Sequence, residues 1–418
     1  MKILHTGDWH LGKRFYNISL EEDFEFIVDQ VKTAMVEKNP DTIILAGDIY
    51  DRAAPPKEAM TLFNSFCEFV KSSGKNLIII AGNHDSRALI EGLGTLAPSN
   101  TFLVRGKLTN DEKPIILEDE HGKVAISGLP FAYEYEAKDV FDDPEINTPE
   151  DVIKAQINST KKYIEKDMRW IVVAHTFVGS SVKETQGERP ISFVGGVENV
   201  SHELFEGADY VALGHIHKPQ KIKKDTIRYA GAPLAFGFDE HEEKSMALID
   251  LGKKGDVLIE TIPFKPKRKV RIIEGKLSDL LKEENQTDDF IQIVLTDDKT
   301  QLDAMKKLQD VYKNAVSLTY KKDENILSID DADIPSIEGA EPLDVISSFL
   351  HFTRDVGPDE KETDLIQVKI KEINEETLGK LFSYFIIETI IIGKLLNINP
   401  FNQPAVEQVK EYTKELLS

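Results

Sequence analysis

The chain has 418 residues, of which 41% are hydrophobic and 30% are charged, and its net charge is −22. This length predicts two or three domains, and the acidic balance argues against a general nucleic-acid coat protein, which would be basic. The single cysteine, Cys67, excludes a disulfide framework and is typical of a reducing compartment. We recognise neither a secretory leader nor an apolar run of membrane-spanning length, and we therefore expect a cytoplasmic protein without a membrane partner.

The first 264 residues alternate β-like apolar runs with amphipathic segments, which predicts an α/β fold. Strands are expected at residues 3–6, 42–46, 76–80, 124–127, 170–174 and 210–213. Helices are expected over 24–37 and 57–71, where the apolar spacing suits packing on a sheet. After Gly214 the strands become short and rich in turns, which indicates a mixed sheet or a sandwich.

Prolines and a basic cluster interrupt this alternation at residues 263–269, so we place the end of the first domain at residue 264. Residues 265–330 indicate a small α+β module. An acidic linker and a helix are expected over 331–372. A helical tail is expected over 373–418, where capping signals occur without a β pattern.

Five polar clusters follow the expected strands, in the order D-x-H, G-D-x-x-D, G-N-H-D, H and G-H-x-H. Because each strand can deliver its cluster to the same sheet edge, residues far apart in the chain can converge. Carboxylate, amide and imidazole groups are suited to two adjacent divalent cations. The candidate ligands are Asp8, His10, Asp48, Asn83, His175, His215 and His217.

The charges of these candidate ligands favour an anionic substrate. Two divalent ions bring four positive charges, of which the carboxylates of Asp8 and Asp48 neutralise two and the neutral ligands none. The remaining positive charge suits a phosphodiester anion, which a site crowded with carboxylates would repel. Asp48 follows Gly47, where the backbone can turn, and could bridge the two ions.

His84 is adjacent to a candidate ligand, but the ligand set is sufficient without it. We therefore expect a protonated His84 to give a proton to the leaving oxygen, with Asp85 holding its orientation. A single D-x-H or strand-end histidine is more often structural. Five such clusters in order, each after a strand, favour a catalytic site. His5 lies inside its strand and is expected to be structural.

The five clusters are similar to those of the calcineurin-like metallophosphoesterase superfamily. The flanking sequences resemble the SbcD family, the nuclease subunits of bacterial SbcCD complexes, at residues 5–12, 46–51, 188–190, 194–196, 209–220 and 229–235. This resemblance covers residues 1–330 and extends more loosely to about 370. It implies a four-layer sandwich of two mixed β-sheets flanked by helices, with a small α+β capping domain and a helical C-terminal tail.

The resemblance also implies a dimanganese DNA nuclease, with Mg²⁺ as an alternative metal, that has endonuclease and 3′–5′ exonuclease activities. Its implied role is to process DNA ends and hairpins in repair, recombination and replication, within a heterotetramer of two such chains and an SbcC-type ATPase. Carried over motif by motif, Asp8, His10 and His217 would hold one ion and Asn83, His175 and His215 the other, with Asp48 bridging and His84 catalytic.

Basic residues beside the domain boundary fit contacts with DNA phosphates by charge, and a solvated linker face is an equally good interpretation. The candidates are Lys265, Lys267, Arg268, Lys269, Arg271 and, in an SbcD-like flank, Arg189. Phe15 and Tyr16 could stack on a base or pack in the core. A helical segment near residues 343–352 resembles the part of SbcD that docks the coiled-coil root of SbcC. Its apolar face could equally pack on its own domain.

Residues 376–417 do not resemble SbcD. The segments 377–381 and 399–410 are similar to the C-terminal end of glucose-6-phosphate isomerase, in which the lysine that matches Lys410 is catalytic. The sugar-phosphate-binding domains of that enzyme are absent from the sequence, so we expect a helical appendage without catalysis of its own.

Two other functions are compatible with parts of the pattern. A small-molecule phosphodiesterase or phosphatase of the same superfamily would use the same ligands, although a capping domain and a partner-binding helix argue against it. A non-catalytic scaffold that binds DNA ends would need a degenerate site, and the intact ligand set argues against that.

Overall fold

The computed structural model describes residues 1–95, 101–179, 199–282, 286–297 and 303–321. The chain divides into two units, Met1–Glu324 and Asn325–Ser418, and all described residues belong to the first. Arg189, the expected linker and helix at 331–372 and the expected tail at 373–418 lie outside the described residues.

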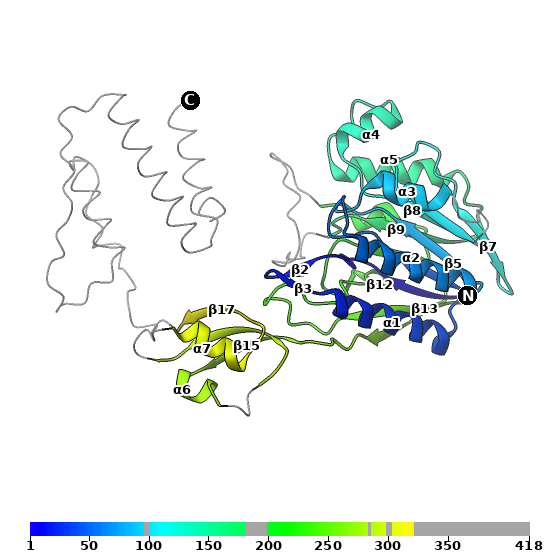
Figure 1. Ribbon diagram of the computed structural model, residues 1–418. Coiled ribbons are helices and arrows are strands. Elements are labelled where there is room, and N and C mark those ends of the chain that lie inside the picture. The colour runs from blue at the N-terminus through cyan, green and yellow to red at the C-terminus, as the bar shows by residue number, and fades with distance from the viewer. Residues whose placement is uncertain (96–100, 180–198, 283–285, 298–302, 322–418) are drawn as a thin grey trace, which may run out of the picture. The chain divides into compact units, whose positions relative to one another are not determined.

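Two six-stranded sheets form the main part of the first unit (Figure 1). The first has the order β14-β13-β1-β4-β5-β6, with bounds Val257–Pro263, Ser245–Leu251, Lys2–Thr6, Thr42–Leu45, Asn76–Ile80 and Phe102–Arg105. The second has the order β11-β12-β10-β9-β8-β7, with bounds Gln220–Ile222, Lys224–Tyr229, Tyr210–Gly214, Arg169–His175, Gly122–Leu129 and Ile115–Asp119. Both sheets combine a parallel centre with antiparallel strands at an edge, and are therefore mixed.

Most residues of the central strands are apolar because both faces of these strands are buried. Along β4, Ile43 and Leu45 join the core beneath the helices, whereas Ile44 joins the core between the two sheets. On β9 the same alternation separates Val172 from Val173. This period of two is the geometry of a strand, and it explains why these segments read as continuous hydrophobic runs.

Helices form the two outer layers. The first sheet is covered by α1 (Glu21–Lys38), α2 (Lys57–Ser72) and α3 (Arg87–Thr95), and the second by α5 (Pro149–Lys161) and the 3₁₀ helix η1 (His202–Phe205). A further helix, α4 (Glu134–Phe141), packs beside α5. The expected four-layer sandwich is confirmed (Figure 1). No helix in the described ranges has the length and apolar character to cross a membrane.

A third sheet follows residue 269. Its parallel strands β15 (Val270–Gly275), β16 (Phe290–Leu295) and β17 (Ala315–Tyr320) pack with α6 (Leu277–Leu280) and α7 (Ala304–Val311) around a core of their own. The helices and strands expected for residues 265–330 are therefore present in the described part of this segment. The ring centroid of Phe290, at the start of β16, lies 4.7 Å from that of Phe15. A short hairpin, β2 (Arg14–Phe15) and β3 (Ile18–Ser19), carries this contact.

Candidate metal centre

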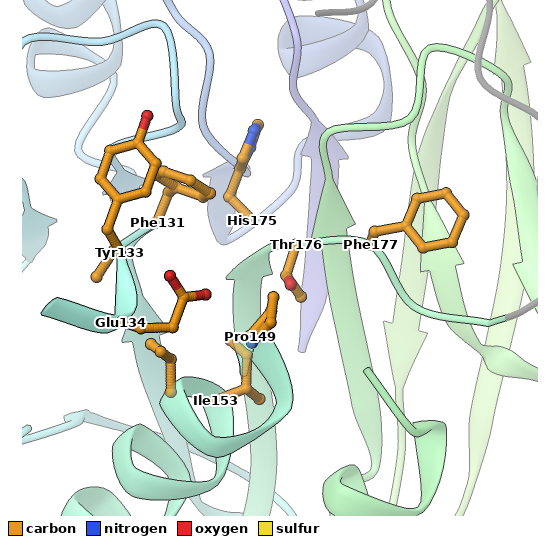
Figure 2. Close-up of a pocket in the computed structure, with 10 residues that line it drawn as sticks. Phe131, Tyr133, Glu134, Pro149, Ile153, His175, Thr176 and Phe177 are labelled. Carbon is orange, nitrogen blue, oxygen red and sulfur yellow. The ribbon is translucent and has the colours of Figure 1, made fainter. Parts of the chain in front are cut away.

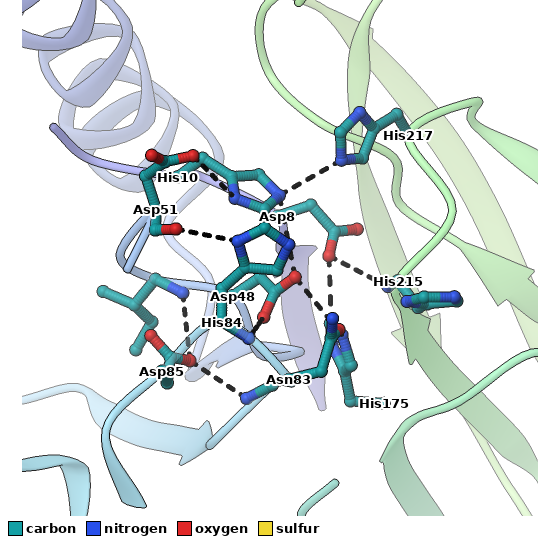
Figure 3. Close-up of polar contacts among 12 residues, drawn as sticks. Asp8, His10, Asp48, Asp51, Asn83, His84, Asp85, His175, His215 and His217 are labelled. Carbon is teal, nitrogen blue, oxygen red and sulfur yellow. Dashed lines mark hydrogen bonds and ion pairs between the residues drawn. The ribbon is translucent and has the colours of Figure 1, made fainter. Parts of the chain in front are cut away.

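All seven candidate ligands lie where a strand of one of the two large sheets ends (Figure 3). Asp8 and His10 follow β1, Asp48 follows β4 and Asn83 follows β5, whereas His175 ends β9 and His215 and His217 follow β10. These strands run parallel within each sheet. The expected convergence at one edge is therefore what the structure shows, and it involves both sheets.

The ligand loops turn sharply directly after their strands. The backbone φ angle is 51° at Asp8, 48° at His10, 49° at Asp48 and 109° at His215, values that cost a non-glycine residue about 1–3 kcal/mol. Neighbouring loops hold these conformations: the amide of Asp8 donates to the carbonyl of Gly47 at 3.0 Å, and that of His10 donates to the carbonyl of Asp48 at 3.0 Å. Such stored strain is typical of functional sites.

The glycines beside the ligands allow close approach. A Cβ atom on Gly47, whose φ is +90°, would lie 2.4 Å from Nδ1 of His175. A Cβ atom on Gly214 would lie 1.9 Å from the carbonyl oxygen of Ala46. The G-D and G-H pairs of the motifs therefore bring the two sheets into contact beneath the site.

Asp48 occupies the middle of the cluster. Its Oδ2 atom lies 3.6 Å from Nε2 of His10 and 3.5 Å from Nε2 of His175. Its Oδ1 atom accepts a hydrogen bond of 2.9 Å from the amide of His84, which fixes the carboxylate. One carboxylate oxygen thus faces a histidine of each sheet, as a bridging ligand must.

The first group of candidate ligands contains two imidazoles in close contact. Nε2 of His10 lies 3.1 Å from Nε2 of His217, and burial lowers the pKa of both rings. Two neutral rings can meet at this distance only around a shared proton or a cation. Nδ1 of His10 is buried and has no hydrogen-bond partner among the residues that the structure describes.

In the second group, Nε2 of His175 lies 3.0 Å from Oδ1 of Asn83, and its Nδ1 donates to the carbonyl of Ala46 at 2.9 Å. Burial lowers the pKa of His175, but the charges of Asp48 and Asp8 outweigh burial and raise it to about 9. A cation would therefore replace a proton here.

His215 completes the second group. Its amide donates to Oδ1 of Asp8 at 2.9 Å, and burial lowers its pKa to about 3, so the ring is neutral. Its Nε2 atom is buried without a hydrogen-bond partner within the described part of the chain. Neutral imidazole nitrogens, an amide oxygen and carboxylates fit divalent cations. Two groups of side chains, His10–Asp48–His84 and Asp8–Asp48–His175, each have ligand atoms within 4.8 Å of one another.

His84 lies beside this cluster, and the centroid of its ring is 4.6 Å from the ring centroid of His10. The expectation that Asp85 orients His84 is wrong. Nδ1 of His84 donates to the backbone carbonyl of Asp51 at 2.8 Å. The carboxylate of Asp85 instead accepts from the amides of Ile49, Tyr50 and Gly82 at 3.2, 2.9 and 2.9 Å. Asp85 therefore fixes the shape of the loop after β4 and does not hold the ring.

Sequence reasoning missed one buried pair that supports His217. Nδ1 of His217 lies 3.4 Å from Oε1 of Glu240, and Nζ of Lys244 lies 2.5 Å from Oε2 of Glu240 and 3.1 Å from the carbonyl oxygen of His217. Burial raises the pKa of Glu240, but His217 and Lys244 bring it to about 2, so the group is ionised. A carboxylate on the far nitrogen fixes the tautomer that presents Nε2 to a metal. No spacing motif marks Glu240, because it lies in a loop.

We expect Glu240→Gln to weaken metal binding at the His10–His217 group about 10- to 100-fold. The amide keeps the shape of the side chain, but it removes the negative charge that supports the His217 ring. Isothermal titration with Mn²⁺ measures the effect. Glu243→Gln, which changes an exposed acid three residues away, is the matched control. Equal affinities in the two variants would contradict a supporting role for Glu240.

The basic residues near the expected end of the first domain are largely engaged in ion pairs. Arg268 pairs with the buried Asp23 of α1 and donates to the carbonyl of Ser19, Lys267 pairs with Glu22, and Arg271 lies 2.9 Å from Asp289. The ring of Phe290 lies beneath the guanidinium of Arg268, 4.4 Å away. Lys265 and Lys269 make no side-chain ion pair with any described residue.

The structure shows the surroundings of Phe15, Tyr16 and His5. Phe15 is buried against Phe290, which favours the core-packing interpretation, whereas Tyr16 is 51% exposed. His5 lies inside β1, and its Nδ1 atom is 2.9 Å from the hydroxyl of Tyr210. This contact between the sheets agrees with the structural role expected for His5.

Arg268 joins the third sheet to α1, and we expect Arg268→Ala to destabilise the protein by about 3 kcal/mol, since it leaves Asp23 buried without its partner. Lys267→Ala removes an exposed, solvent-screened pair and should change the stability much less than Arg268→Ala does. Urea unfolding gives both values. A small effect of Arg268→Ala on stability, together with a shallower salt dependence of DNA binding, would instead indicate a phosphate contact.

The comparisons with known proteins agree with this geometry. The family model described as calcineurin-like phosphoesterase matches residues 1–219, and the model described as type 5 capsule protein repressor C-terminal domain matches residues 266–354. The chain is 33% identical over 325 residues to a nuclease subunit of SbcCD from Staphylococcus epidermidis, and the match covers 76% of this chain and 85% of that relative. With the strand-end clusters of that family gathered at one edge of two mixed sheets, this chain belongs to the SbcD family of calcineurin-like phosphoesterases and is a metal-dependent phosphodiester hydrolase.

Proposed function

We propose that this chain is the nuclease subunit of an SbcCD-type complex, with Mn²⁺-dependent endonuclease and 3′–5′ exonuclease activities on DNA ends and hairpins. We place its role in DNA repair, recombination and replication. The observation that carries the proposal is Asp48, whose Oδ2 atom lies 3.6 Å from His10 and 3.5 Å from His175. DNA is proposed as the substrate because a relative of this chain is named a nuclease subunit.

The proposed ligand sets are those implied by the motifs. Asp8, His10 and His217 would hold one ion, Asn83, His175 and His215 the other, and Asp48 would bridge them. Mn²⁺ suits this set of oxygen and imidazole ligands, with Mg²⁺ as a substitute. Ions bound here would polarise the phosphodiester and activate a water for in-line attack.

His84 would act as the general acid. The carbonyl of Asp51 holds its Nδ1–H, and the backbone amide of His84 is tied to Asp48. This arrangement leaves Nε2–H of the protonated ring to donate to the departing 3′ oxygen. Cleavage would then yield a 3′ hydroxyl on one product and a 5′ phosphate on the other.

The other segments would serve binding and assembly. We propose that the sheet of β15–β17 caps the site and helps to hold DNA, and that residues 331–372 dock an SbcC-type ATPase. Two copies of this chain would assemble with that partner in a heterotetramer. Lys265 and Lys269 are exposed and make no side-chain ion pair with described residues, so we propose these two lysines for phosphate contacts.

A second function has one observation in its favour. The ion pairs of Lys267, Arg268 and Arg271 remove much of the positive charge that would attract DNA at the boundary. A small-molecule phosphodiesterase or phosphatase would not need that charge.

The two functions separate in one experiment. The purified chain in Mn²⁺ is given labelled single-stranded and hairpin DNA, with bis-p-nitrophenyl phosphate and a cyclic nucleotide in parallel. Cutting of DNA supports the nuclease. Faster turnover of the cyclic nucleotide than of DNA supports the alternative.

A further inference from the structure

Exposed aromatic rings lie beside the second group of candidate metal ligands. Tyr133 and Tyr135 are 38% and 64% exposed, and they flank the start of α4. Their rings are stacked, with centroids 5.5 Å apart and an interplanar angle of 12°. The small core beneath α4 is formed by other residues, such as Ala137 and Val152.

A continuous series of ring contacts connects this pair to the site. The centroid of Phe131 lies 5.0 Å from that of Tyr133 and 6.4 Å from that of His175. Figure 2 shows Phe131 between Tyr133 and His175, at a pocket that these residues line with Glu134, Pro149 and Ile153. The rings therefore lead outward from the metal centre.

Contacts with the loop that follows β5, which carries Asn83, and with the helix after it support this series. The amide of Phe131 donates to the carbonyl of Ala81 at 2.9 Å, two residues before Asn83. Arg87, at the start of α3, lies 5.5 Å from the ring centroid of Tyr133 and pairs with Glu136. A substrate bound at the metals would thus meet these rings at a fixed distance.

Within this series Tyr135 offers the free ring surface. Arg87 lies over the ring of Tyr133 and Tyr135 stacks on it, so Tyr133 is largely engaged. Tyr135 is the more exposed of the two. A planar aromatic or heteroaromatic group that follows the phosphodiester could continue this stack.

We propose that Tyr135, supported by Tyr133 and Arg87, stacks on a nucleobase of the DNA strand whose phosphate lies at the metal centre. This proposal rests on the proposed nuclease function and deepens it. A chain with a net charge of −22 gains little from long-range attraction of DNA. Stacking depends little on charge and is tolerant of sequence, because every base has an aromatic face.

The test compares Tyr135→Ala, Tyr135→Phe and Phe26→Ala, which removes an exposed aromatic residue from α1. With single-stranded DNA in Mn²⁺, Tyr135→Ala should raise KM about tenfold with kcat nearly unchanged. Tyr135→Phe, which keeps the aromatic ring, and Phe26→Ala should both have the wild-type KM. Bis-p-nitrophenyl phosphate, which has no nucleobase and is too short to reach along the rings, should be cleaved equally by all.

Abasic substitution identifies the base. DNA with one abasic nucleotide, moved stepwise along each side of the scissile phosphate, should lose affinity at one position for the wild type. Tyr135→Ala should show no such loss. A wild-type KM for Tyr135→Ala, or an abasic effect that persists in it, would overturn the stacking proposal.

Failure of the nuclease proposal gives a different result. The oligonucleotide would then remain uncut and is tested as a competitive inhibitor of bis-p-nitrophenyl phosphate hydrolysis. Weaker inhibition of Tyr135→Ala than of the wild type would still support the stacking site. Equal inhibition of both, or none, would overturn it.

Discussion

Replacing His84 by glutamine should lower kcat for DNA cleavage about 10²- to 10⁴-fold while both metal ions stay bound. The side-chain amide of glutamine can still donate to the carbonyl of Asp51, which accepts Nδ1–H of His84 at 2.8 Å. It cannot give up a proton. The measurements are kcat with labelled DNA in Mn²⁺ and the metal content of the dialysed protein.

The leaving group provides the control for His84. p-Nitrophenolate is a stable anion and departs without protonation, so His84→Gln should cleave bis-p-nitrophenyl phosphate much more nearly at the wild-type rate. An equal loss on both substrates would contradict the general-acid role. A loss of metal from the variant would instead make His84 a ligand, a role that its position within 4.8 Å of ligand atoms of His10 and Asp48 also permits.

Asp48→Asn should weaken the binding of both ions by more than about 100-fold and abolish hydrolysis of every diester. The loss should exceed the 10- to 100-fold typical of a supporting residue, because Asp48 itself faces both groups of imidazoles. The substitution also removes one of the few negative charges that would offset the charge of the ions. Metal content and Mn²⁺ titration measure this directly.

Asp41→Asn is the matched control for Asp48→Asn. Asp41 directly precedes β4 and is exposed, whereas Asp48 follows the same strand at its other end. Its Oδ2 atom accepts from the amide of Lys2 at 2.7 Å, and an asparagine can keep that bond. Loss of only one ion from Asp48→Asn would show that Asp48 serves a single ion and does not bridge.

The central strands were predictable from sequence because both of their faces are buried, so that β4 and β5 are apolar after their first residues, Thr42 and Asn76. The edge strands were not. Along β7, Ile115 is buried, Ile116 is 43% exposed, and Glu118 and Asp119 follow in the strand. Such a half-exposed strand resembles a loop in composition, and its pairing with β8 is a tertiary contact that a local pattern does not contain.

The candidate site divides in the same way. Asp8, Asp48 and His175 could be named in advance, because strand ends and short motifs are local properties of the chain. The support of His217 by Glu240 joins residues 23 positions apart through a loop. The ring of His84 is oriented by the backbone carbonyl of Asp51. Any residue at position 51 would supply this carbonyl, so the residue type there does not reveal the contact.

Charge in the sequence was the least reliable predictor of free positive charge at residues 265–271. Arg268 is basic and lies in a basic cluster, but its partner Asp23 comes 245 positions earlier, in α1. Only the packing of α1 against the boundary segment brings the two together. A cluster of like charge in sequence therefore need not be a cluster of free charge in space.

The position of the candidate ligands between the two sheets has a mechanical consequence. Asp8, Asp48 and Asn83 follow strands of one sheet, and His175 and His215 belong to the other, so bound ions would cross-link them. Ligands that bind only the folded state stabilise it by mass action. The strained loops would then be kept in place by the ions that they hold, and the sandwich would be most tightly closed when the centre is fully loaded.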